Sequence, residues 1–288
     1  MSTRQSKKER QLGVSKSKNQ RVCLFCDEDL SSGRSREHVF PQWLLDELNI
    51  RSEQVSAVHV FKPEEPDSEP ELLSERSLTL EKLREGRICA CCNNGWMSEL
   101  ENSCKGVLLD LIHGRRQPAQ LSETECLPIA RWAAKTAYML NSSANYTIKA
   151  PPQQLRELRE NTRDLPWGVV VIAATGPFVN FRWFQSNRWM LCAPDNLTKR
   201  IADLMDTRTY KIGVQFGHML LIVAWHAIPG WWKMLWSHQH VVLWPWKGKC
   251  GWHEDDVSVL DALGPDMVLP IQVQQIKLVH PRYLLWLK

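Results

Sequence analysis

The 288-residue sequence contains no apolar run of the roughly 18 residues that a membrane-spanning helix needs. Its first 21 residues contain no apolar core of the kind that a signal peptide requires. The sequence also has no P-loop, no GxGxxG fingerprint, no serine-nucleophile elbow and no internal repeat, which argues against the nucleotide-binding and serine-hydrolase classes that carry them. We therefore expect a cytoplasmic protein without a membrane partner.

The formal net charge is only +4, but the charge is unevenly distributed. Residues 1–21 hold seven lysines and arginines against Glu9 alone. Such a polar segment cannot bury a core, so we expect residues 1–20 to form a disordered basic tail. Two interpretations remain open: a solvated tail, or an arm that neutralises nucleic-acid phosphates.

The clearest pattern is a pair of Cys-x-x-Cys motifs. In a chain expected to be cytoplasmic the thiols stay reduced, which favours metal binding over disulfides. Four thiolates in two such turns form a closed tetrahedral zinc site that builds structure and performs no chemistry. The asparagine directly after Cys92 favours Cys89 and Cys92 as the second pair of ligands over a pair that uses Cys91. The predicted zinc ligands are Cys23, Cys26, Cys89 and Cys92, and the other five cysteines are expected to be buried core residues: Cys91, Cys104, Cys126, Cys192 and Cys250.

A Glu-His-hydrophobic-hydrophobic-Pro segment lies between the two cysteine pairs, as Glu37-His38-Val39-Phe40-Pro41. Residues of about 51–80 are acidic and rich in serine and proline, and we interpret them as an insertion, a surface loop with a strand at Val55–Phe61. After the second cysteine pair, apolar residues recur every three to four positions from Met97 to Leu111, which predicts a helix.

The remainder of the chain has a different pattern. Helices are predicted over 123–140 and 153–162, followed by strands over 168–174, 179–184, 189–192, 211–227 and 240–246. All but two of the 14 tryptophans lie after residue 120. They indicate a Trp-rich core and rim or, alternatively, aromatic surfaces that stack on bases or line a ligand pocket. We predict an α+β fold with a zinc domain at 21–116 and a Trp-rich α+β domain of unknown role at 117–288.

The order CxxC, then Glu-His-hydrophobic-hydrophobic-Pro, then CxxC-Asn leading into a helix resembles the zinc-bearing branch of the HNH endonucleases. The resemblance covers about residues 21–113. It implies a treble-clef ββα-metal module that hydrolyses nucleic-acid phosphodiester bonds with one divalent ion, Mg²⁺ or Mn²⁺, alongside the structural zinc. It favours DNA over RNA as the substrate and implies a role in phage defence or in a mobile element.

The resemblance also implies roles for individual residues. His38 stands at the position of the general base that activates water. Glu37 and Asn93 stand at the positions that bind the catalytic ion, and a carboxylate with an amide oxygen suits Mg²⁺ or Mn²⁺. Asn93 has a second interpretation, because Asn93, Asn94 and Gly95 also suit a left-handed turn. Glu99 and Glu101 are expected to face solvent, and the arginines expected to bind phosphate are Arg36, Arg84 and Arg87.

One position departs from the family pattern. The asparagine that usually precedes the second CxxC, and that helps to fix the general base, is absent from residues 83–88. Asn94 or backbone carbonyls are the substitutes that the sequence offers. The departure keeps open a non-cleaving, zinc-stapled nucleic-acid-binding protein, and also a protein-interaction scaffold in which zinc only holds the fold.

Overall fold

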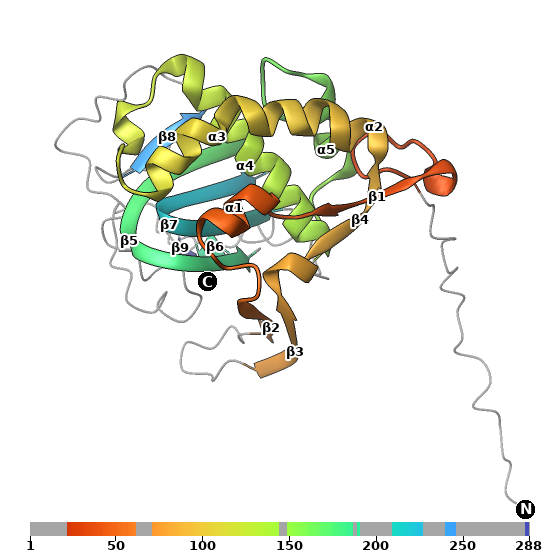
Figure 1. Ribbon diagram of the computed structural model, residues 1–288, viewed down its shortest axis with the longest axis horizontal. Coiled ribbons are helices and arrows are strands. Elements are labelled where there is room, and N and C mark those ends of the chain that lie inside the picture. Colours follow the sequence, from red (N-terminus) through yellow and green to blue (C-terminus); the bar gives the residue numbers. More distant parts are fainter. Residues whose placement is uncertain are drawn as a thin grey trace, which may run out of the picture.

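A computed structural model describes residues 22–61, 71–143, 149–186, 189–190, 209–226, 240–245 and 286–287 (Figure 1). The predicted basic tail lies outside the described residues. So do the Pro-rich part of the acidic segment and the tryptophans at 231, 232, 236, 246 and 252.

The N-terminal part is organised around a two-stranded antiparallel ribbon. Strand β1 (Arg34–His38) pairs with β4 (Arg84–Cys89), with Arg34 opposite Cys89 and Glu37 opposite Glu85. The ribbon is followed by a short helix, α2 (Ala90–Cys92), a π-helical turn and the long helix α3 (Ser98–Ile112). Between the two strands lie α1 (Gln42–Glu47) and an antiparallel hairpin of β2 (Gln54–Phe61) and β3 (Glu71–Thr79), which projects from the body (Figure 1).

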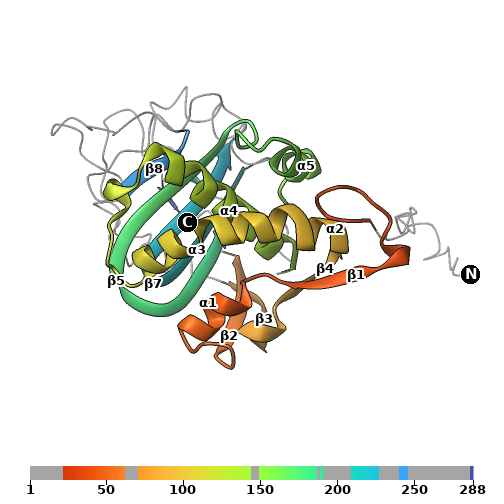
Figure 2. The ribbon, with the colours of Figure 1, turned by 45° about the horizontal axis from the view of Figure 1, so that its top comes forward.

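The C-terminal part begins with two helices, α4 (Glu123–Ser143) and α5 (Pro152–Glu160). Its main sheet is antiparallel and has the strand order β7-β5-β8. Helices α3 and α4 lie against this sheet (Figures 1 and 2). The strands of this part are β5 (Val169–Ser186), β6 (Trp189–Met190), β7 (Thr209–His226), β8 (His240–Trp244) and β9 (Trp286–Leu287), of which β6 and β9 form a separate pair.

The mixed helix and sheet content confirms the predicted α+β class at that level. Two local predictions were wrong. The acidic segment is not a loop with one strand, because β2 and β3 pair through most of its length. The two strands predicted at 168–174 and 179–184 form one long strand, β5, because its pairing with β7 continues across an irregularity between Thr175 and Phe181.

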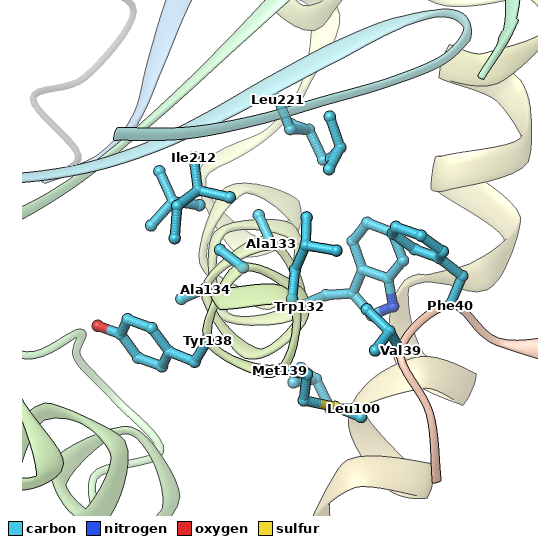
Figure 3. Close-up of a cluster of buried hydrophobic side chains, with 14 of the residues drawn as sticks. Val39, Phe40, Leu100, Trp132, Ala133, Ala134, Tyr138, Met139, Ile212 and Leu221 are labelled. Carbon is cyan, nitrogen blue, oxygen red and sulfur yellow. The ribbon is translucent and has the colours of Figure 1, made fainter. Parts of the chain in front are cut away.

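Helix α4 forms the centre of the core. Every residue from Ile129 to Asn141 is buried, so the helix is covered on all sides, as Figure 3 shows. Trp132 points toward Val39 and Phe40, whereas Ala133 faces the sheet residue Leu221 (Figure 3). A helix in this position contacts both parts of the chain.

The two parts share one hydrophobic core. The Phe40 ring from the N-terminal part lies 5.0 Å from the Phe181 ring and 5.2 Å from the Phe216 ring, both edge-on. Most of the buried hydrophobic residues, from Cys23 to Leu243, belong to one continuous cluster that includes both parts of the chain. The division at 116 and 117 therefore stays a prediction based on sequence character, and packing is continuous across it.

A glycine brings α3 close to the sheet. Gly217 on β7 has φ +55°, a conformation that side-chain-bearing residues rarely adopt. A Cβ atom at this position would lie 2.3 Å from the carbonyl oxygen of Ile112, at the end of α3. The absence of a side chain at Gly217 thus lets α3 pack closely on β7. Helix α3 in turn carries part of the site described below.

Candidate functional site

The four predicted zinc ligands meet at the end of the ribbon. Their sulfur atoms all lie within 4.8 Å of one another, and Sγ of Cys26 lies 3.6 Å from Sγ of Cys89. Four sulfurs at about 2.3 Å from a tetrahedral zinc ion are separated by about 3.8 Å. The cluster therefore has the dimensions of a structural metal site such as zinc.

Hydrogen bonds of the two turns also suit thiolate ligands. The Cys89 N–H donates to Sγ of Cys23 at 3.4 Å, and the Cys92 N–H donates to Sγ of Cys89 at 3.3 Å. The Cys92 thiol and backbone N–H groups lower the pKa of Cys23 to about 4, while burial raises the pKa of Cys89 to about 12. Zinc binds thiolates, so a divalent ion bound here would oppose the upward shift and favour the ionised form of Cys89.

The other cysteines separate into two kinds. Cys104 and Cys126 are buried, as predicted. Cys91 is exposed, contrary to the prediction, because it lies on the outer side of α2 between two ligands whose sulfurs turn inward. Cys192 and Cys250 lie outside the described residues.

Glu37 and Asn93 come together beside this cluster. Successive side chains of a strand alternate between its faces, so Ser35 and Glu37 of β1 share one face. Asn93 begins the π-helical turn after α2 and reaches back to this face. Its Nδ2 donates to Oγ of Ser35 at 2.7 Å, and its amide also acts on the Glu37 carboxylate, whose pKa it lowers.

Two charged residues from the helices complete the surroundings of Glu37. Burial raises the pKa of Glu37, the positive charge of Lys135 and the Asn93 hydrogen bond oppose this shift, and the negative charge of Glu101 adds to it. Nζ of Lys135 lies 2.5 Å from Oε1 of Glu101. The Lys135 side chain is fully buried, and that of Glu101 is 17% exposed.

The sequence prediction therefore missed Glu101 and Lys135. Glu99 is exposed as expected, but Glu101 faces inward because α3 packs against α4, which carries Lys135. A sequence signal for Lys135 exists: it lies four residues after Arg131 in a stretch, 126–140, whose other residues are almost all apolar. Its partner could not be found in this way, because Glu101 is 34 residues away.

His38 has a different set of neighbours from Glu37, as expected for adjacent residues of a strand. Nε2 of Gln42 lies 3.4 Å from Nδ1 of His38. Burial and the positive charges of Arg84 and Arg51 lower the pKa of His38, so the imidazole is neutral at pH 7. Gln42, which contacts this ring, was not predicted from the sequence. The available signal was its position four residues after His38.

The three predicted phosphate-binding arginines lie in different places. Arg36 is exposed on β1, and Arg84 lies opposite His38 in the ribbon. Arg87 contacts the Glu85 carboxylate and donates to Oγ of Ser142 near the C-terminal end of α4. The structure thus places Arg84 beside His38, and Arg87 in a contact between the ribbon and α4.

No family model, curated protein or solved structure matches this chain. Among the described helices, none is both long and apolar enough to cross a membrane.

Proposed function

We propose that this protein is a metal-dependent endonuclease of the HNH type, built on a treble-clef module that one zinc ion holds at Cys23, Cys26, Cys89 and Cys92. The observation that carries the proposal is that Asn93, 56 residues after Glu37, reaches back to β1 beside the four-cysteine cluster, where it contacts Ser35 at 2.7 Å and acts on the Glu37 carboxylate. A surface Glu-His pair and a simple turn at Asn93 would not require this contact.

In the proposed reaction, Glu37 and Asn93 hold a divalent ion, Mg²⁺ or Mn²⁺, through a carboxylate and an amide oxygen. When bound, this ion supplies charge stabilisation to the scissile phosphate and the leaving oxygen. Burial of Glu37 and its hydrogen bond to Asn93 fix the carboxylate before substrate arrives.

His38 is the proposed general base. A neutral imidazole can accept a proton from water, and burial together with Arg84 and Arg51 favours the neutral form. The contact with Gln42 supports a fixed ring orientation in place of the missing asparagine. Arg84 and the exposed Arg36 are the proposed contacts to substrate phosphates, with DNA as the expected substrate.

A second function also has support from one observation. The neighbours of His38 differ from those of Glu37, and two of them, Arg84 and Arg51, are cationic. A ribbon face with His38 among arginines suits phosphate binding without cleavage. The alternative is therefore a zinc-stapled protein that binds nucleic acid but does not cut it.

A plasmid-nicking assay in Mg²⁺ or Mn²⁺, which compares wild type with His38→Ala, distinguishes the nuclease from the non-cleaving binding protein. Loss of a general base should slow nicking by about 10² to 10⁴-fold. His113→Ala is the matched control, because His113 is outside the proposed site and forms its 2.7 Å contact with Glu47.

Nicking by wild type that persists in His38→Ala would disprove the role of His38. If wild type shifts DNA in a gel but cuts neither DNA nor RNA with either ion, the binding protein is the correct interpretation. If wild type does not bind nucleic acid at low salt either, the protein is an interaction scaffold in which zinc only holds the fold.

A further inference from the structure

Helix α4, in the other part of the chain, carries a buried charged side chain whose charge acts on the candidate ion site. Lys135 is fully buried and pairs with Glu101 of α3, and its charge also acts on Glu37 of β1. One ammonium group thus contacts the Glu101 carboxylate directly and acts through its charge on the Glu37 carboxylate of another element.

Stability alone gives no reason for this pair. Removing an ammonium group and a carboxylate from water costs energy, and apolar replacements of such pairs are often neutral or stabilising. The surrounding core is apolar enough for such a replacement, since the α4 neighbours Ala134, Ala137 and Met139 are all buried. A buried ion pair at this place is therefore explained better by what it holds in position.

We propose that Lys135 is a positioning residue of the nuclease site, which holds Glu101 and Glu37 in the arrangement that receives the divalent ion; this inference rests on the proposed function. Glu101 adds a second carboxylate near that of Glu37, and Lys135 offsets the repulsion between them. The site is then assembled from β1, the turn at Asn93, α3 and α4, and residues 21–116 by themselves lack one of its members.

A lysine near carboxylates can instead replace a metal ion, and the contacts distinguish the two roles. The direct partner of the Lys135 ammonium is Glu101, at 2.5 Å. The Asn93 amide and the Lys135 charge both lower the pKa of Glu37. The ammonium therefore acts on Glu37 through its charge while it contacts Glu101, whereas Asn93 reaches β1 from the end of α2.

The test measures Mn²⁺ binding to the full-length, zinc-loaded protein by electron paramagnetic resonance, below the melting temperature of every variant. Lys135→Met keeps the length of the side chain and removes its charge. We expect it to weaken Mn²⁺ binding by about 10 to 100-fold, the usual effect of losing a group that orients metal ligands. Glu101→Gln, at a partly exposed position, should act in the same direction and serves if Lys135→Met does not fold.

Arg131→Met is the matched control. Arg131 is also a buried cation of α4, one turn earlier, but it donates to the backbone carbonyls of residues 158, 161 and 164. Its loss should lower the melting temperature and leave Mn²⁺ affinity unchanged. Because Lys135 acts through Glu101, the double variant Lys135→Met/Glu101→Gln should bind Mn²⁺ no more weakly than the weaker single variant.

Unchanged Mn²⁺ affinity in Lys135→Met with a lower melting temperature would assign Lys135 a structural role and overturn the inference. Tighter binding would also overturn it, because Lys135 would then compete with the ion. Glu37→Gln identifies the failing step: if it abolishes binding while Lys135→Met does not, only the inference fails. If wild type binds no Mn²⁺, the proposed function and the inference fail together.

Discussion

The four-cysteine cluster and the site around Glu37 both lie on the ribbon of β1 and β4, but they are assembled in different ways. Each cysteine pair is a local turn, and one strand pairing, Arg34 opposite Cys89, brings the two turns together. The site around Glu37 combines a strand, a π-helical turn and two helices, and its innermost member comes from α4. Sequence spacing reveals the first kind of site, whereas the second exists only after packing.

The largest expected effect comes from removing the metal ligands. Cys89→Ser should release zinc and unfold residues 21–113 together with the core that they share with the rest of the chain, because structural zinc contributes about 10–16 kcal/mol to the folding of small metal modules. It should also abolish Mn²⁺ binding, since β1 and the turn at Asn93 would separate. Zinc content and a thermal melt measure this.

Cys91→Ser is the matched control for this experiment. Cys91 is exposed and its sulfur is not part of the cluster, so the variant should keep its zinc and its melting temperature. Retention of one zinc per chain by Cys89→Ser, at the wild-type melting temperature, would show that the cluster does not hold the module.

A smaller effect tests whether the two parts of the chain are independent. Phe40→Ala removes a buried ring that contacts Phe181 and Phe216, and it should cost about 3–5 kcal/mol of unfolding free energy. Because the core is shared, zinc release and tryptophan fluorescence should change in one urea transition. The matched control is Phe178→Ala, whose side chain is 52% exposed and should contribute within about 0.5 kcal/mol.

Two separate urea transitions, with Phe40→Ala affecting only one of them, would contradict a shared core. The division of the chain at 116 and 117 would then describe two folding units.

The smallest expected effect concerns an ion pair across the same division. Arg116 donates to the Glu125 carboxylate at 2.7 Å, and Ser122 at the start of α4 also donates to that carboxylate. Arg116 is the main cause that lowers the pKa of Glu125 to about 2. Glu125→Gln keeps the helix-capping hydrogen bond and loses the charge, so it should cost about 1 kcal/mol, or about 2–4 °C.

The pH dependence of this contribution has a definite sign. The pKa of Glu125 is lower in the folded protein than its ordinary value of 4.5, so the stabilisation is present above about pH 4.5 and is lost as the pH falls toward 2. Melts of wild type and Glu125→Gln should therefore converge in acid. Glu123→Gln, in the same turn, is the control. A difference between the melting temperatures of wild type and Glu125→Gln that stays constant at all pH values would contradict the ion pair.

Much of the secondary structure could be predicted, because hydrophobic periodicity is a local property. Helices α3, α4 and α5 lie within a few residues of their predicted positions. The missed pairing of β2 with β3 and the continuity of β5 depend on partners elsewhere in the chain. The meeting of Glu37 with Asn93 was a hypothesis from motif order, while Glu101 was expected to face solvent.

By itself, the sequence determined the four-cysteine cluster, the α+β class and the candidates Glu37, His38 and Asn93, because two short turns and a strand fix the positions of those residues. Tertiary structure alone decided that Lys135 pairs with Glu101 and acts on Glu37, that His38 has other neighbours, and that Phe40 joins the two parts in one core. The physical reason is that a buried charge or ring acquires its partners only when helices and strands pack, and packing brings together residues that no short spacing connects.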